Sequence, residues 1–407
     1  MPAAPVGPSV HALAARLRAH HLPTLTDEVF RHILEVMPEY LAVGSLTAAD
    51  LREACSHSLD QMLRELMGLP VDSGDEQRVS LQETGRRRAQ EGLPMEWLLH
   101  SFRLCGRAIW QGLVAEATRA GGDRVHRLLA EAVVVWDALD RVSTIVAKAY
   151  RDEQSRLQRT TQRRREMVLS ALLERRASTQ SAVAEASEVL GIPVHGPRFV
   201  VLWVVGSAHP EAGPTPEVVL RSAGFSSAWV TQGARDSGLV ALGTPDDVET
   251  AVAKLADCLP GTATVSPLID GFDDVATAHR LTALTLRTLP STFSGIARVT
   301  DRLPHALVAG VPDVSDVLVQ HTLGGLLGLR PAEREVYLTT LEALVDADGS
   351  FSGAARRLYC HRNTVLKRAH RIEALTGRRL TNMRAMVELY LAVLAVRMDA
   401  DQSVHRP

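Results

Sequence analysis

The sequence has 407 residues, which is more than one hydrophobic core supports, so two to four domains are expected. An apolar fraction of 46% excludes a disordered chain, and the net charge of −2 shows no overall basic character. No apolar run is long enough to span a membrane, and the first ten residues lack the basic start and apolar core of a signal peptide.

The four cysteines lie far apart and form no CxxC pair. They therefore argue against a zinc site or a disulfide framework and fit a reducing cytoplasm. No metal or other cofactor is expected. The cysteines are Cys55, Cys105, Cys258 and Cys360.

Residues 9 to about 120 have the apolar periodicity of a helical bundle. Thr26 and Asp27 are expected to cap a helix that runs towards Met37, and Thr47 to cap the next. A third helix is expected over 75–91, and Pro94 opens a fourth. One buried face of this fourth helix is predicted to carry Leu98, Phe102, Cys105 and Ile109.

The segment RRRAQEGLPMEWLLHSFRLCGRAIW resembles the N-terminal sensor domain of Rsb-type stress-signalling proteins, which also heads many actinobacterial PucR-type regulators. The resemblance covers about residues 35 to 150 and implies a sensor domain over 9–150. The residues expected to line an effector pocket are His57, His100, Arg103, Arg107 and Trp110. The alternative is that the tryptophans are core and the other four side chains are ordinary surface.

Residues 123 to about 176 are predicted to form one long helix, because no Gly or Pro occurs between Asp123 and Leu190. In its second half, Tyr150, Leu157, Arg164 and Ala171 recur every seven residues. Such a thin seam predicts a marginal coiled coil, which suits a signalling helix in a dimer. A linker is therefore placed at 151–190, and a solvated connector is the alternative.

Residues 195 to about 310 alternate between predicted strands and helices, which indicates an α/β domain. PRFVVLWVVGS is expected to be a buried strand, SSAWVTQ and SGLVALG a hairpin, and HALVAG the final edge strand. The order resembles the degenerate GGDEF-like domain in the middle of PucR-type regulators.

An active diguanylate cyclase of this fold has a Gly-Gly-(Asp/Glu)-Glu-Phe hairpin, whereas this hairpin reads Gly-Ala-Arg-Asp-Ser over 233–237. A single glycine and a single acid remain, so no enzyme activity is expected. The acid pairs Asp246-Asp247 and Asp273-Asp274 are interpreted as helix caps rather than metal ligands. A cyclase or phosphodiesterase centred on 195–310 is the enzymatic alternative.

The last domain, 313–400, is expected to be helical, with helices beginning near Asp313 and at Pro331. Within it, 348–380 has the pattern of a helix-turn-helix. Gly349 ends the preceding helix, Ser352 is the expected N-cap of a short helix, and a turn at 359–361 leads to a helix over 362–376.

The helix over 362–376 has two faces. Val365, Ala369 and Ile372 form one apolar stripe, and polar or basic side chains occupy the other side. From 355 to 380 there are eight Lys or Arg against one Glu, a local charge of +7. Because DNA is a dense polyanion, this pattern predicts an interface with double-stranded DNA.

HRNTV followed by RIEALTG resembles the C-terminal domain of PucR-type regulators, which include sugar-diacid regulators of the CdaR kind. Leu366 and Lys367 depart from the family pattern. The resemblance implies a helix-turn-helix that binds DNA. The expected DNA-binding residues are His361, Arg362, Asn363, Thr364, Lys367, Arg368, His370, Arg371 and Arg378.

Together these features predict a mainly α multidomain protein with a helical bundle, a long connecting helix, a central α/β domain and a helix-turn-helix. The expected function is that of a cytoplasmic, dimeric transcriptional regulator of the PucR type. Its expected partners are DNA, a second copy of the chain, and a small-molecule or protein effector. A stress-signalling scaffold that acts through the N-terminal bundle is the non-enzymatic alternative.

Overall fold

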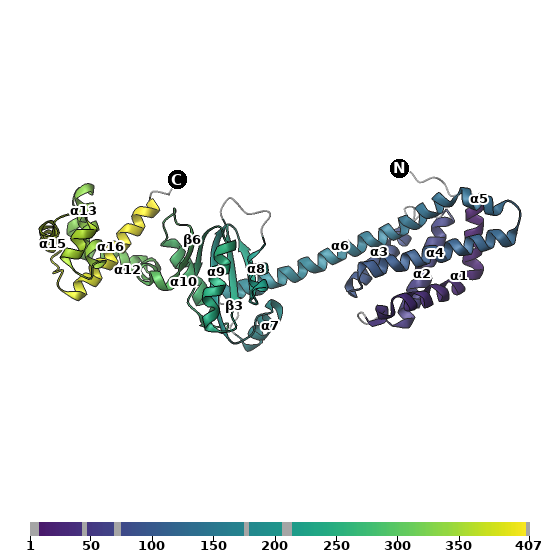
Figure 1. The fold of residues 1–407 in the computed structure, drawn as a ribbon, viewed down its shortest axis with the longest axis horizontal. Coiled ribbons are helices and arrows are strands. Elements are labelled where there is room, and N and C mark those ends of the chain that lie inside the picture. Colours follow the sequence, from purple (N-terminus) through teal and green to yellow (C-terminus); the bar gives the residue numbers. More distant parts are fainter. Residues whose placement is uncertain (1–7, 43–46, 69–74, 175–178, 206–213, 404–407) are drawn as a thin grey trace. The chain divides into compact units, whose positions relative to one another are not determined.

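The computed structural model describes residues 8–42, 47–68, 75–174, 179–205 and 214–403 (Figure 1). The chain divides into two compact units, residues 1–162 and 163–407, and each is described by itself. No helix within the described ranges combines the length and apolar character that a membrane crossing requires.

The first unit is a bundle of helices around one apolar core (Figure 1). Its core includes Ile33, Leu59, Ile109 and Val142, each 0% exposed. The four residues expected on the buried face of the fourth helix are all buried. The elements are α1 (Pro8–Val36), a 3-10 helix (Pro38–Ala42), α2 (Ala48–Leu66), α3 (Asp75–Gln90), α4 (Met95–Ala120), α5 (Arg124–Ala130) and the first part of α6 (Ala132–Leu173).

Two expected helix boundaries in this unit are wrong. Helix α1 runs through Pro23 without a break at Thr26, whose hydroxyl donates to the carbonyl of Leu22 (2.8 Å) instead of capping a new helix. The long helix is interrupted at Glu131, between α5 and α6. The Glu131 carboxylate accepts a hydrogen bond from the backbone N–H of Val10 (3.2 Å), so a contact distant in sequence accompanies this break.

The second unit begins with the end of α6 and contains a mixed sheet of six strands in the order β2-β3-β1-β4-β6, with β5 paired to β1. Strands β2 and β3 form the expected hairpin, and β4 and β6 are parallel. The elements are α7 (Gln180–Leu190), β1 (Pro197–Val205), α8 (Pro216–Ser222), β2 (Ser226–Gln232), β3 (Arg235–Ala241), α9 (Val248–Cys258), β4 (Gly261–Val265), β5 (Ile269–Asp270), α10 (Val275–Arg287) and β6 (Gly295–Arg298).

Helices cover both faces of this sheet. The end of α6, α7 and α10 share one apolar cluster with Val200 and Leu239, while α8 and α9 share another with Phe199 and Val240. Because neighbouring residues of a strand point to opposite faces, β1 and β3 supply side chains to both clusters. The end of α6 is thereby part of the core of the central domain.

The segment HALVAG is not the final edge strand. It belongs to helix α11 (Leu303–Gly310), and the edge strand is β6. A short apolar run fits either a strand or a helix by pattern alone. Here Pro304 lies in the first turn of a helix that buries Ala306, Val308 and Ala309.

The C-terminal helices pack around a further apolar core that includes Leu323, Leu341 and Leu389. Pro331 opens the first helix of the predicted DNA-binding segment, as expected. The helices are α12 (Pro312–Leu327), α13 (Pro331–Val345), α14 (Phe351–Arg357), α15 (Arg362–Thr376) and α16 (Met383–Ser403).

Candidate nucleic-acid interface

Helices α14 and α15 and the turn between them form the predicted helix-turn-helix. Gly349 has a left-handed backbone (φ 77°) after α13, as expected. The N-cap of α14 is Ser350 and not Ser352, because the Ser350 hydroxyl accepts the backbone N–H of Gly353 (3.1 Å). Ser352 instead lies inside the first turn of the helix.

Helix α15 has the predicted bounds, and the residues that flank it cap both of its ends. His361 is its N-cap, and its Nδ1 accepts the backbone N–H of Asn363 (3.2 Å). Gly377 ends the helix in the left-handed conformation (φ 66°). His361 therefore has a structural task in addition to the expected DNA contact.

The inner face of α15 is anchored in two apolar clusters. Val365 packs with Ala354, Ala355 and Leu344, and Ile372 packs in the core that contains Leu341. Val365 and Ile372 are each 0% exposed, and Ala369 is 2% exposed. This burial fixes which side of α15 faces away from the protein.

The outward face of α15 carries the predicted polar and basic side chains. Thr364 and Arg368 are half-buried at its edges. His370 lies 3.4 Å from the carboxylate of Glu373. Within the part of the chain that the structure describes, the other four side chains have no hydrogen-bond or ion-pair partner. These four exposed side chains are Arg362, Asn363, Lys367 and Arg371.

Two of the eight basic residues in this segment are neutralised by nearby acids. Arg378 forms an ion pair with Glu388 of α16, and its side chain is 18% exposed. Arg357 contacts the carboxylate of Asp346 (3.3 Å). The structure therefore separates Arg378 from the exposed cations of α15, although the sequence grouped them together.

Tyr359, in the turn before α15, was not predicted from sequence as a site residue. Its side chain is 97% exposed, and its backbone is left-handed (φ 51°), which is costly for a residue with a Cβ. Cys360 beside it is half-buried against the cluster around Val365. The pattern of the sequence holds no signal for an exposed aromatic residue at this position.

The hairpin at 233–237 has a two-residue turn, with Gln232 opposite Arg235. No group of three or more His, Cys, Asp or Glu suited to a metal ion occurs among the described residues. Asp247 accepts the backbone N–H of Thr244 (2.7 Å) in a capping box, whereas Asp274 forms no side-chain cap bond. Both acids thus lie at helix N-termini, as interpreted from the sequence, although Asp274, the N-cap residue of α10, forms no side-chain capping bond there.

The five expected effector residues lie on two helices of the bundle, α2 and α4. His57, on α2, lies 2.7 Å from the hydroxyl of Ser80 on α3. The other four follow α4, where Arg103 and Arg107 are exposed and Trp110 lies 6.2 Å from Trp136.

The bundle also contains a basic concavity of about 380 Å³ between α3 and α6, which the sequence did not indicate. Its lining includes Arg86, Lys148, Arg156 and Arg159. Because these residues are far apart in sequence, only the packing of α3 against α6 reveals the site.

Three sequence families match the chain in succession. Residues 23–165 match the RsbT co-antagonist protein rsbRD N-terminal domain, residues 174–288 match the GGDEF-like domain, and residues 337–395 match the PucR C-terminal helix-turn-helix domain. These matches confirm the resemblances found in the bundle, in the central domain and in the helix-turn-helix.

Among solved structures, the chain is similar to a regulator of polyketide synthase expression from Bifidobacterium adolescentis. The two share 18% sequence identity with a TM-score of 0.32, and the match covers 60% of this chain and 98% of the other. No curated protein matches the chain in sequence.

Proposed function

We propose that this chain, which carries the domains of PucR-type regulators, is a sequence-specific DNA-binding transcriptional regulator that inserts α15 into the major groove. One observation carries the proposal. Helix α15 buries Val365 and Ile372 in two apolar cores. Its opposite face exposes four side chains that have no hydrogen-bond or ion-pair partner among the described residues: Arg362, Asn363, Lys367 and Arg371. In helix-turn-helix domains, the second helix usually lies in the major groove and contacts the base edges with such outward side chains.

The outward side chains divide into two proposed roles. Asn363 and Lys367 lie near the centre of the face opposite Val365, so we assign them to base edges. Arg362, Arg368 and Arg371 lie towards the flanks, where phosphates would be, and Thr364 and His370 lie beside them. His361 and Arg378 remain proposed phosphate contacts, although His361 also caps α15 and Arg378 is paired with Glu388.

We propose that regulation proceeds by a population shift. An effector or protein partner would bias the N-terminal bundle, and α6 would relay the bias to the central domain. The relay is supported by Leu169, Leu172 and Leu173 at the end of α6, which are buried with residues of β1, β3 and α10. Domain limits at 9–150, 151–190, 195–310 and 313–400 are part of the same proposal.

The central domain is proposed to have no catalytic role. Its hairpin offers Asp236 and a single Gly233 where a cyclase has two glycines and adjacent acids. Purified protein with GTP and Mg²⁺ should therefore form no cyclic dinucleotide. Measurable product, lost in an Asp236→Asn variant, would show that this part of the proposal is wrong.

A selection experiment tests the proposed DNA recognition. The full-length protein is incubated with a library of random DNA duplexes, and bound DNA is sequenced over successive rounds. We expect one enriched motif for the parent and loss of that motif for Asn363→Ala. If the parent enriches no motif, sequence-specific recognition by α15 is wrong.

Because the target would be chromosomal DNA, we propose that the protein acts in the cytoplasm.

A further inference from the structure

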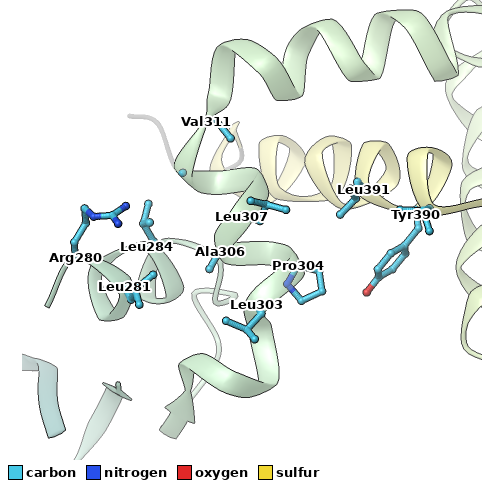
Figure 2. A pocket seen from close by; sticks show the side chains of 12 residues that line it. Arg280, Leu281, Leu284, Leu303, Pro304, Ala306, Leu307, Val311, Tyr390 and Leu391 are labelled. Atoms are coloured by element: carbon cyan, nitrogen blue, oxygen red, sulfur yellow. The ribbon is translucent and has the colours of Figure 1, made fainter. Parts of the chain in front are cut away.

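An apolar groove lies where the central domain meets the C-terminal helices. It has a volume of about 720 Å³, and its lining comes from α10, from α11 with the following Val311, and from α16 (Figure 2). Pockets of about 300–1,000 Å³ with mostly apolar walls and a few polar groups are typical of small-molecule sites. The size and lining of this groove fit that description.

The walls of the groove expose aliphatic side chains to solvent. Leu303 is 51% exposed, Leu307 is 61% exposed and Val387 is 52% exposed. Removing such surface from water is favourable, so an apolar ligand would gain from covering them. Polar groups are few: the lining has one hydroxyl, of Tyr390, and one charged side chain, of Arg280.

Arg280 and Tyr390 lie on opposite sides of this groove. Figure 2 shows Arg280 on α10 at one side and Tyr390 with Leu391 on α16 at the other, with the α11 residues between them. Arg280 is exposed, and it has no ion-pair partner in the described ranges of the chain. A guanidinium at one side of an apolar groove is complementary to a carboxylate attached to an apolar body.

We propose that this groove binds an amphipathic monocarboxylate, whose hydrocarbon part covers Leu303 and Leu307 and whose carboxylate pairs with Arg280. Such a ligand would contact α10 of the central domain and α16 of the DNA-binding helices at once. It would therefore favour the arrangement of these helices to which it binds more tightly, by an amount set by the difference between its affinities for the two arrangements. This inference rests on the proposed function, for which it supplies an effector class and a second input site.

The test uses the full-length protein and the fluorescent polyene carboxylate cis-parinaric acid as the probe. Decanoate and decanol then compete with the probe, because they share a chain length and differ in the carboxylate. We expect saturable binding of one probe per chain and displacement by decanoate at lower concentration than by decanol. Arg280→Gln should weaken decanoate about tenfold and leave decanol unchanged.

Two pairs of exposed residues provide matched controls. Arg287→Gln removes an exposed arginine of α10 that does not line the groove, and should leave decanoate binding unchanged. Leu307→Gln should weaken decanoate and decanol alike. Val314→Gln alters a residue of similar exposure (64%) outside the groove and should weaken neither.

Three outcomes would overturn the proposal. Equal competition by decanoate and decanol would remove the role of Arg280, and parent-like binding by Leu307→Gln would place the site elsewhere. Light scattering that shows a dimer for the parent and a monomer for Leu307→Gln would mean that a second copy covers the groove. DNA titrations on the same samples, without any carboxylate, show independently whether DNA recognition holds.

Discussion

At the scale of single residues, the backbone of Tyr359 is the least expected feature of the DNA-binding segment. A left-handed residue with a Cβ costs about 1–2 kcal/mol, and glycine avoids this cost at the expense of more freedom in the unfolded chain. We expect Tyr359→Gly to stabilise α14 and α15 by up to about 1 kcal/mol and Tyr359→Val to destabilise them. Hydrogen exchange of the amides in α14 and α15 measures both effects, and reduced protection in Tyr359→Gly would contradict the expectation.

A second residue-scale prediction concerns His279 of α10, which links two parts of the central domain. Its Nε2 lies 3.2 Å from the hydroxyl of Ser237 on β3. Burial lowers the pKa of His279, and a backbone hydrogen bond to Leu173 at the end of α6 and the charge of Glu174 only partly oppose this. The pKa of His305 on α11 is likewise lowered by burial and by Arg302.

The sign of the pH effect follows from these lowered values. As the pH falls below about 6.5, the unfolded chain binds protons that the folded chain does not, so the free energy of unfolding decreases. We expect the melting temperature of the second unit to fall between pH 7 and pH 5. His279→Gln should reduce this slope, whereas His195→Gln, at an exposed position, should not. Equal slopes for the parent and His279→Gln would contradict the role given to burial.

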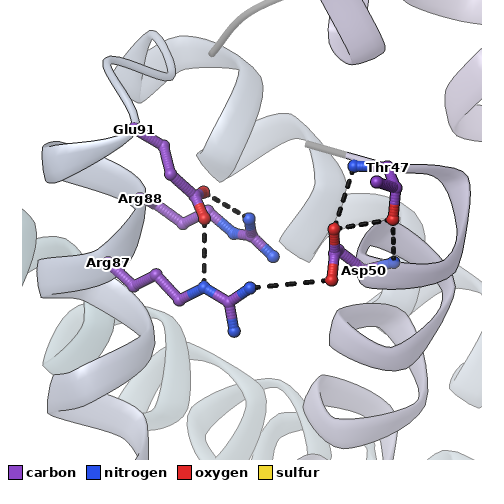
Figure 3. A network of polar contacts seen from close by, with 5 residues as sticks. All are labelled: Thr47, Asp50, Arg87, Arg88 and Glu91. Atoms are coloured by element: carbon purple, nitrogen blue, oxygen red, sulfur yellow. Dashed lines mark hydrogen bonds and ion pairs between the residues drawn. The ribbon is translucent and has the colours of Figure 1, made fainter. Parts of the chain in front are cut away.

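At the scale of helices and strands, local hydrogen bonds explain which boundaries could be predicted. Thr47 was expected to cap α2, and it does so in a capping box with Asp50 (Figure 3). The hydroxyl of Thr47 accepts the backbone N–H of Asp50 (3.1 Å), and the carboxylate of Asp50 accepts that of Thr47 (3.0 Å). The ion pair between Asp50 and Arg87 (3.8 Å) could not be predicted, because it joins α2 and α3.

The boundaries that sequence failed to predict depend on contacts distant along the chain. Thr26 has the residue type of a cap, but it is 3% exposed on the inner face of a helix that continues past it. The break at Glu131 includes a bond to Val10. By contrast, the hydrophobic period of α15 and the glycine after it contain enough information to give both of its ends.

The packing of α12 against α15 gives a prediction with a matched control. A Cβ at Gly325 would collide with the carbonyl oxygen of Leu375, whereas a Cβ at the neighbouring Gly324 would meet nothing within 4 Å. Gly324→Ala should therefore stabilise α12 by about 1 kcal/mol, as in an ordinary helix interior. Gly325→Ala should displace α15 and destabilise the domain. Thermal unfolding of the two variants compares them, and equal stability would contradict the close approach.

At the scale of the whole molecule, the order of domains was readable from sequence, because each domain has its own periodicity and motif. The sequence predicted less about α6, because its heptad positions make different contacts. Of the heptad positions, Tyr150 is buried and donates to the carbonyl of Leu93 (2.7 Å), and Arg164 pairs with Glu185 (2.9 Å). Leu157 is half-buried, so a second copy of α6 that packs against it would remove further apolar surface from water.

Dimer formation is the corresponding prediction. The full-length chain should sediment at twice its mass of 44.2 kDa, since closed two-fold dimers match palindromic operators. Leu157→Asp should weaken the dimer, because a charge would replace an apolar side chain of the heptad positions, and Gln158→Asp on the exposed side should not. A parent that stays monomeric at micromolar concentration would contradict the expectation.

We propose that the outward face of α15 contacts DNA bases. A binding titration on the selected motif and on a scrambled duplex, at several salt concentrations, tests this docking. Asn363→Ala should lose about 1–3 kcal/mol on the motif and nothing on the scrambled DNA. Arg371→Ala should weaken both DNAs and flatten the salt dependence by about one unit. Arg378→Ala should do the same to a smaller degree, because Glu388 already neutralises Arg378. If Asn363→Ala binds both duplexes as the parent does, the proposed docking of α15 is wrong.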